Sequence, residues 1–128
     1  MKSNFTNKNQ QHFLALFLLI SVTGVLALQS TNEVELFLQA KTYFYQRNYK
    51  KAIEAYDKIL SEYPESNYLA DATYWMGYSY ELNNQLDDAI KTYDSVANNF
   101  PSSRYADEAG VGVSILAGHL VRLGHKQY

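Results

Sequence analysis

The chain has 128 residues, enough for one domain, and its hydrophobic content of 47 %, with 15 % aromatic residues, is sufficient for a packed core. A formal net charge of −2 with scattered basic residues excludes a basic surface for a phosphate backbone, so we expect no nucleic-acid partner. Cysteine is absent, which excludes disulfides, thiolate metal sites, a cysteine nucleophile and lipid attachment through cysteine.

Residues 1–29 have the layout of a secretory signal. A polar start with Lys2 and Lys8 precedes an apolar run over residues 13–28, and Val25 and Ala27 occupy the positions that a signal peptidase reads. The alternative is an uncleaved membrane anchor, although residues 13–28 span roughly 24 Å at 1.5 Å rise, short of the ~30 Å hydrocarbon core. Both interpretations place the rest of the chain outside the cytoplasm. A cleaved signal would make it periplasmic or secreted, and an uncleaved one would anchor it in the inner membrane through residues 13–28.

Residues 33–66 and 67–103 repeat one pattern with a shift of 37 residues. In each unit an apolar stripe at helical spacing is followed by a break, a second stripe and a proline that ends it. The second stripes match at Tyr49, Ala52, Tyr56, Ile59 and Pro64, and at Leu86, Ala89, Tyr93, Val96 and Pro101. Such a repeat predicts stacked helical hairpins, with small Ala40 and Gly77 where first helices approach their neighbours closely.

Polar residues between the stripes predict the turns and the helix starts. Asn48 and Asn84 are expected in left-handed backbone conformations between helices, because asparagine tolerates that region. Ser66 and Ser103 each follow a proline by two residues and are expected as N-caps of the next helices.

The pattern starts a third time and stops halfway. A fifth helix is expected from about Arg104, within a half repeat over residues 104–124. Its apolar stripe at i, i+3, i+7 and i+10 consists of Val113, Leu116, Leu120 and Leu123. Because no partner helix follows in the sequence, we expect this stripe to be exposed and to form an assembly face for another copy.

Position by position, the units resemble tetratricopeptide repeats. The residues that match this family are Ala40, Tyr43, Ala52, Tyr56 and Pro64, then Gly77, Tyr80, Ala89, Tyr93 and Pro101. The period of 37 exceeds the common 34 because the Pro-x-Ser-x-Tyr linkers are longer, and this linker with the segment 72–77 resembles the repeats of bacterial envelope proteins. Two types fit: the Tol-Pal cell-division coordinator and the outer-membrane assembly lipoprotein. The first has a coiled coil before its repeats and the second a lipid-bearing cysteine, and neither feature is found here.

The resemblance implies an all-α fold. This fold is an antiparallel helical-hairpin solenoid over residues 30–128, with two full repeats plus a fifth helix, preceded by a signal or anchor helix. In such repeats the first helices line a groove that binds a protein or peptide. The groove positions are Phe37, Lys41, Phe44, Tyr45, Tyr74, Tyr78 and Glu81. The alternative for Phe37, Tyr45, Tyr74 and Tyr78 is packing in the core, and Trp75 suits either role.

Catalytic constellations are not found in the sequence. His119 and His125 are six residues apart, which does not put both on one helix face for a metal ion. Asp87 and Asp88 fit the start of a helix, where acidic side chains are favoured. We therefore expect no enzyme activity, no metal and no cofactor. The sequence predicts a protein-interaction scaffold in the bacterial cell envelope, with a self-assembling homo-oligomer as the alternative.

Overall fold

The computed structural model describes residues 32–124, and the structural statements below concern these residues. The chain divides after Val34, and almost all of the helical repeats belong to the unit that begins at Glu35. The predicted signal or anchor, residues 1–29, lies outside the described part. Within residues 32–124, no helix is both long enough and apolar enough to cross a bilayer.

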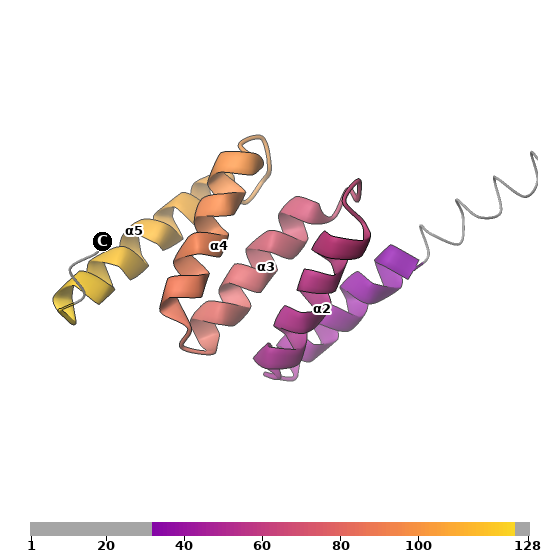
Figure 1. Cartoon of the computed structure of the whole chain (residues 1–128), viewed down its shortest axis with the longest axis horizontal. Coiled ribbons are helices and arrows are strands. Elements are labelled where there is room, and N and C mark those ends of the chain that lie inside the picture. Colours follow the sequence, from indigo (N-terminus) through magenta and orange to yellow (C-terminus); the bar gives the residue numbers. More distant parts are fainter. Residues whose placement is uncertain (1–31, 125–128) are drawn as a thin grey trace, which may run out of the picture. The chain divides into compact units, whose positions relative to one another are not determined.

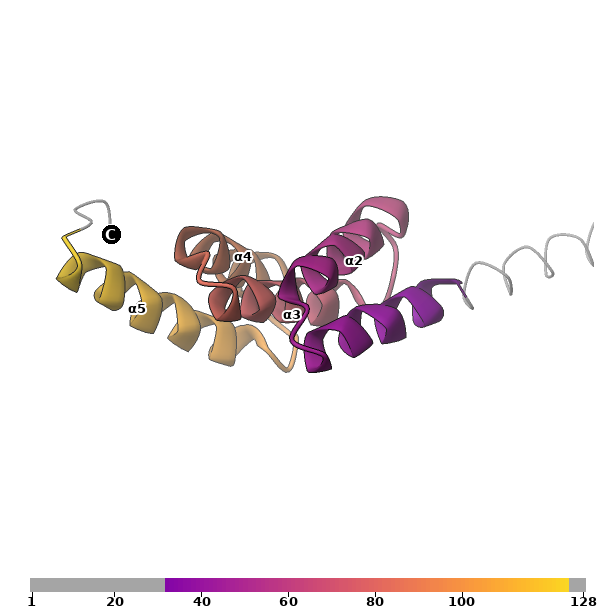
Figure 2. The same ribbon diagram turned by 90° about the horizontal axis from the view of Figure 1, so that it is seen from below.

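The described residues form five helices and no strand. A helix over residues 32–45 is followed by α2 (Tyr49–Glu62), α3 (Leu69–Leu82), α4 (Leu86–Asn99) and α5 (Ala106–Arg122). Successive helices run antiparallel and each packs against the next (Figure 1). Seen from the side, the helix of residues 32–45, α3 and α5 form one layer and α2 and α4 the other (Figure 2). This arrangement confirms the predicted all-α fold of helical hairpins.

The turns inside the two hairpins are built alike. Arg47 and Asn84 have positive φ values of 59° and 60°, and they are equivalent positions of the 37-residue repeat. The prediction of a left-handed turn is confirmed for Asn84 and wrong for Asn48. Asn48 is instead the N-cap of α2, where its side chain accepts a hydrogen bond of 3.4 Å from the Lys51 amide. Because capping requires non-helical backbone of negative φ, the left-handed conformation falls on the preceding residue.

The two serines in the linkers act one turn before the helices they were expected to cap. Ser66 accepts a hydrogen bond from the amide of Tyr68 at 3.0 Å, and Ser103 accepts one from the amide of Tyr105 at 3.3 Å. Helices α3 and α5 begin after these tyrosines, without a side-chain cap. The serines therefore fold the linkers rather than terminate the helices, and the N-cap prediction is wrong.

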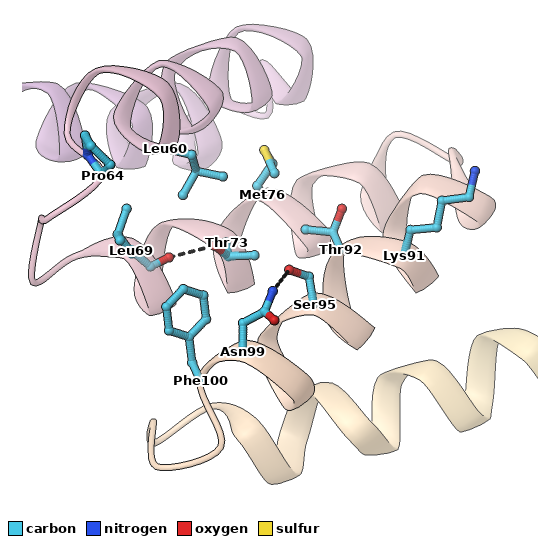
Figure 3. Close-up of a pocket in the computed structure, with 10 residues that line it drawn as sticks. All are labelled: Leu60, Pro64, Leu69, Thr73, Met76, Lys91, Thr92, Ser95, Asn99 and Phe100. Carbon is cyan, nitrogen blue, oxygen red and sulfur yellow. Dashed lines mark hydrogen bonds between the residues drawn. The ribbon is translucent and has the colours of Figure 1, made fainter.

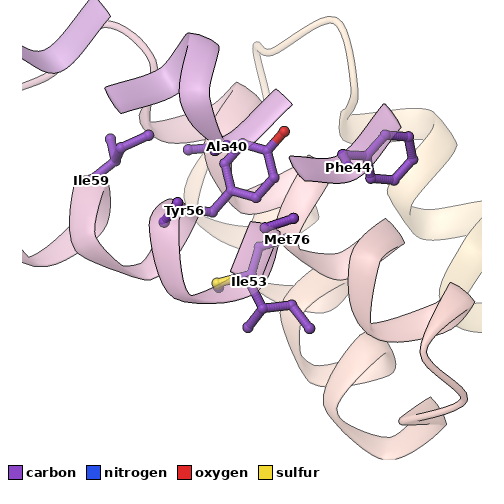
Figure 4. Packing of buried hydrophobic residues seen from close by; sticks show 9 residues of the cluster. Ala40, Phe44, Ile53, Tyr56, Ile59 and Met76 are labelled. Carbon is purple, nitrogen blue, oxygen red and sulfur yellow. The ribbon is translucent and has the colours of Figure 1, made fainter. Parts of the chain in front are cut away.

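The first core cluster joins α2 to the helix of residues 32–45 and to α3 (Figure 4). Ala40, Ala52 and Ala72 are fully buried, which lets these helices approach around the rings and branched chains that fill the remaining space. Tyr56 is fully buried as well, yet its hydroxyl has no hydrogen-bond partner among the described residues. Burial raises the pKa of this hydroxyl above its usual range, so it stays neutral.

Replacing Tyr56 by phenylalanine is expected to raise the free energy of unfolding by about 1 kcal/mol, because it removes a buried polar group that has no partner. Urea denaturation followed by circular dichroism measures this change. Tyr93→Phe is the matched control at the equivalent position, where the hydroxyl does donate a hydrogen bond, and it should destabilise. Equal losses in the two variants would show that the Tyr56 hydroxyl has a partner after all.

The second core cluster is centred on Tyr93 of α4. A Cβ atom built at Gly77 of α3 would lie 2.9 Å from one edge of the Tyr93 ring, and one built at Gly112 of α5 would lie 3.0 Å from the other edge. Helices α3 and α5 therefore pack against opposite edges of the Tyr93 ring, each at a glycine. Gly110 lies two residues before Gly112 in α5, and a Cβ atom built there would face open space.

Gly77→Ala is expected to lower the free energy of unfolding by about 1–3 kcal/mol, because the buried Tyr93 ring has to shift. Gly110→Ala is the matched control and should raise it by about 0.5–1 kcal/mol, since alanine favours the helix and meets no neighbour. Thermal and urea denaturation of both variants measure the difference. Stabilisation by both substitutions would contradict the close contact at Gly77.

Helix α5 packs on α4 with the stripe that was expected to be exposed. Leu116 and Leu120 are only 7 % and 4 % exposed, and Val113 packs against the same cluster. Only Leu123, 61 % exposed, lies open. The expectation of an exposed stripe is thus wrong for Leu116 and Leu120, because both side chains pack against α4. The open side of α5 carries Val111 and Ile115 instead.

Candidate protein-binding face

A cluster of aromatic side chains lies where the helix of residues 32–45 meets α3. We call it the aromatic face; it consists of Lys41, Phe44, Tyr45, Trp75 and Tyr78. The Phe44 ring is its centre, with ring centroids 5.0 Å from Trp75, 5.4 Å from Tyr78 and 5.6 Å from Tyr45. Phe44 is buried, Trp75 and Tyr78 are half-buried, and Tyr45 is 68 % exposed. The exposure of the rings in this face therefore increases from buried Phe44 to solvent-exposed Tyr45.

Lys41 is the cation of this face. Its Nζ lies 3.7 Å from the centroid of the Trp75 ring and 5.4 Å from that of Tyr45. A lysine over a tryptophan ring at this distance makes a cation–π contact worth about 0.5–1 kcal/mol at an exposed site. The contact holds the aliphatic stem of Lys41 against the rings, which adds apolar contact area beside a charged group.

Trp75 connects the aromatic face to the last hairpin. Its indole N–H donates a hydrogen bond of 3.2 Å to the Tyr105 hydroxyl. The Tyr105 ring stacks on Tyr74, with centroids 4.2 Å apart and planes inclined by 5°. Burial, and then the Glu108 carboxylate, raise the pKa of Tyr74 above its usual range. Trp75 is consequently held from two sides, by Phe44 and by Tyr105.

The stack of Tyr74 on Tyr105 has a counterpart in the first repeat. Phe37 stacks on Tyr68, with ring centroids 4.9 Å apart, and both residues of this pair precede those of the other by 37 positions. Each linker tyrosine thus packs on a ring of the first helix of the preceding repeat. These stacks fix the path of the linkers, and they position the first helices that carry the aromatic face.

Charged groups around these rings are largely engaged within the molecule. Glu81 accepts a hydrogen bond of 2.8 Å from the Tyr93 hydroxyl, and burial, followed by this bond, raises the pKa of Tyr93 above its usual range. Arg104 donates to Asp71 from the linker before α5, which raises the pKa of the guanidinium further. Arg104 also lies 4.8 Å from the Tyr105 ring centroid. These bonds tie α3 to α4 and to the linker before α5.

The seven residues predicted to line a groove fall into two sets. Lys41, Phe44, Tyr45 and Tyr78 meet in the aromatic face. The other three lie outside this face: Phe37 packs on Tyr56 and Tyr68, and Glu81 accepts the hydrogen bond of the Tyr93 hydroxyl. Tyr74 packs on Tyr93 and Tyr105 and touches the face at Trp75. The sequence did not decide whether Trp75 belongs to the core or to the binding surface, and it did not predict a role for Tyr105. The repeated Pro-x-Ser-x-Tyr linker could have indicated Tyr105, because it places Tyr68 and Tyr105 in register.

A hollow lies on the side of α4, away from the aromatic face (Figure 3). It has a volume of about 410 Å³ and is bounded by the end of α2, the start and middle of α3, and α4. Its hydroxyl and amide groups are engaged within their own helices: Thr73 donates to the Leu69 carbonyl at 2.7 Å, and Asn99 donates to Ser95 at 3.0 Å. The hollow therefore offers apolar surface with few polar groups to orient a small ligand. Among residues 32–124, no cluster of three or more side chains suits a metal ion.

Comparison with protein families gives a match over most of the chain. The family model described as YfiO, outer membrane lipoprotein, matches residues 29–118, most of the chain. The match spans the helix of residues 32–45, α2, α3, α4 and most of α5. No curated protein matches the chain. Of the two envelope types that the repeats resemble, the match therefore favours the outer-membrane lipoprotein.

Proposed function

The chain belongs to the YfiO family of outer membrane lipoproteins, and we propose that it is a non-catalytic interaction scaffold of the cell envelope. In this proposal it binds a segment of a partner protein on the aromatic face. Helical-hairpin repeats of this kind present extended surfaces for other proteins. The partly exposed rings of the first helices form the candidate surface for such a segment.

The exposed Tyr45 ring, packed edge-on against buried Phe44, is the observation that carries the proposal. Large aromatic side chains with few rotatable bonds bind partners at low cost in conformational entropy, and they dominate binding energy at protein interfaces. Phe44 and Lys41 restrict the position of Tyr45 before a partner arrives. Leu82 repeats the position of Tyr45 in the second unit and is also exposed, so the binding surface extends along α3.

A peptide segment with apolar side chains suits this surface best. The rings supply contact area, while the ammonium group of Lys41 at the edge suits a carboxylate or backbone carbonyl of the partner. The engaged charges of Glu81, Asp71 and Arg104 give the surrounding area no strong excess of one sign. Affinity would therefore come from ring contacts, with weak dependence on salt.

The place of the scaffold in the envelope is part of the proposal. Residues 1–29 export the chain, and the repeat domain of residues 30–128, divided at 33–66, 67–103 and 104–124, lies in the periplasm. Because the sequence has no cysteine, lipid attachment by that route is excluded within these 128 residues. An uncleaved segment 13–28 in the inner membrane is the alternative to a free periplasmic or secreted form.

Site-specific photo-crosslinking tests the proposal. A photoreactive phenylalanine analogue replaces Tyr45 in the full chain, and the matched control carries it at Asn99, an exposed residue of the hollow beside α4. We expect a discrete crosslinked partner in envelope extracts from position 45 and none from position 99. Crosslinks from position 99 alone would assign binding to the α4 side and refute the proposal.

A further inference from the structure

The open side of α5 has an apolar centre and opposite charges at its two ends. Val111 and Ile115 are 58 % and 62 % exposed and lie one turn apart, opposite the leucines that pack on α4. Gly118 continues the same side one turn later, and a Cβ built there would have only the Arg122 side chain nearby, at 4.0 Å. Exposed Asp107 begins this side and exposed Arg122 ends it. We call these five residues the α5 outer face.

We infer that the α5 outer face binds the same face of a second copy of this chain, with the two helices antiparallel. A two-fold axis between Ser114 and Ile115 places Asp107 of each copy opposite Arg122 of the other. The same axis puts Val111 opposite Gly118, so a branched side chain meets a residue without one. Small residues facing large ones allow close helix packing. All these positions lie on one side of α5.

The charge order decides between the two directions of pairing. A parallel pair would put Asp107 beside Asp107 and Arg122 beside Arg122, which is repulsive at both ends. An antiparallel pair turns both ends into oppositely charged contacts, and each is exposed, so salt weakens them. The face is thus complementary to itself in charge as well as shape, as a two-fold interface requires.

The dimer differs from the assembly expected from the sequence. That expectation used Leu116 and Leu120, which pack on α4 and are not available to another molecule. The α5 outer face uses the opposite side of the same helix. It also leaves the aromatic face, which is built from the helix of residues 32–45 and α3, uninvolved.

Sedimentation equilibrium of the full chain and two charge variants tests the dimer. Asp107→Arg leaves only basic charge on the face, and Arg122→Glu leaves only acidic charge. Each variant alone should dimerise at least about tenfold more weakly than the wild type, because both ends become repulsive. A mixture of the two variants should recover mixed dimers, since every charged contact is then between opposite signs.

Recovery in the mixture separates a lost interface from lost folding, because misfolded chains do not regain dimers on mixing. Circular dichroism of each variant verifies that the helices persist. A wild type that stays monomeric at all concentrations would overturn the inference. So would a dimer that neither substitution weakens, or two weakened variants whose mixture stays monomeric.

Discussion

Replacing Tyr93 by alanine is expected to lower the free energy of unfolding by about 3–5 kcal/mol. The ring is 3 % exposed and fills the space between Gly77 and Gly112, so its removal leaves a cavity lined by α3, α4 and α5. A loss of this size is a large fraction of the 5–15 kcal/mol typical of whole domains. Urea denaturation of the full chain at constant temperature, followed by circular dichroism, measures it.

Tyr93→Phe separates the ring from its hydroxyl in the same experiment. This variant keeps the packing and loses only the hydrogen bond to Glu81, so we expect a decrease of about 1–2 kcal/mol. A free energy of unfolding that is lowest in Tyr93→Ala, intermediate in Tyr93→Phe and highest in the wild type would support the ring as the main contact between the last three helices. A loss of less than about 1 kcal/mol in Tyr93→Ala would contradict that role.

Substituting alanine for Tyr45 and Tyr78 together is expected to weaken partner binding about tenfold or more, because truncating a ring at the centre of an interface costs more than 1 kcal/mol each. Both rings contact Phe44, but Tyr45 is exposed and Tyr78 is only half-buried, so neither belongs to the fully buried core. The variant should therefore stay folded. Affinity for the crosslinked partner, measured by calorimetry, gives the change.

Lys91→Ala with Asn99→Ala is the matched control for this double variant. Both residues are exposed and line the hollow beside α4, so their loss should leave affinity within about twofold. If the control variant lost binding while the Tyr45 and Tyr78 variant kept it, the partner would occupy the other layer of the repeat.

Much of the fold could be predicted because the repeat fixes equivalent positions. The 37-residue shift relates Gly77 to Ala40, Tyr93 to Tyr56 and Asn84 to Arg47. Both members of the first two pairs are buried, and both members of the third have positive φ. The preference of asparagine for left-handed backbone predicts such a turn at Asn48. The repeat instead makes Arg47 the equivalent of Asn84, and Arg47 is the residue with positive φ. Register was the better guide than residue type at this turn.

The sequence could not decide which side of a helix finds a partner. Helix α5 has apolar residues on two sides, and periodicity groups Leu116 with Leu120 and Val111 with Ile115 without showing which pair meets α4. The same limit applied to the tyrosines. Tyr74 and Tyr78 lie one turn apart on α3, yet Tyr105 from a distant linker covers only Tyr74. Such contacts depend on tertiary packing, which local spacing does not contain.

Fluorescence of Trp75 tests the central claim of a binding aromatic face most directly. It is the single tryptophan of the chain, and it lies under Lys41 and beside Phe44. Titrating the full chain with a tryptophan-free peptide of the crosslinked partner segment should give a saturable change in Trp75 emission, and this change should be lost in the Tyr45→Ala, Tyr78→Ala variant. Saturable binding by calorimetry with unchanged Trp75 emission would place the partner elsewhere and contradict the claim.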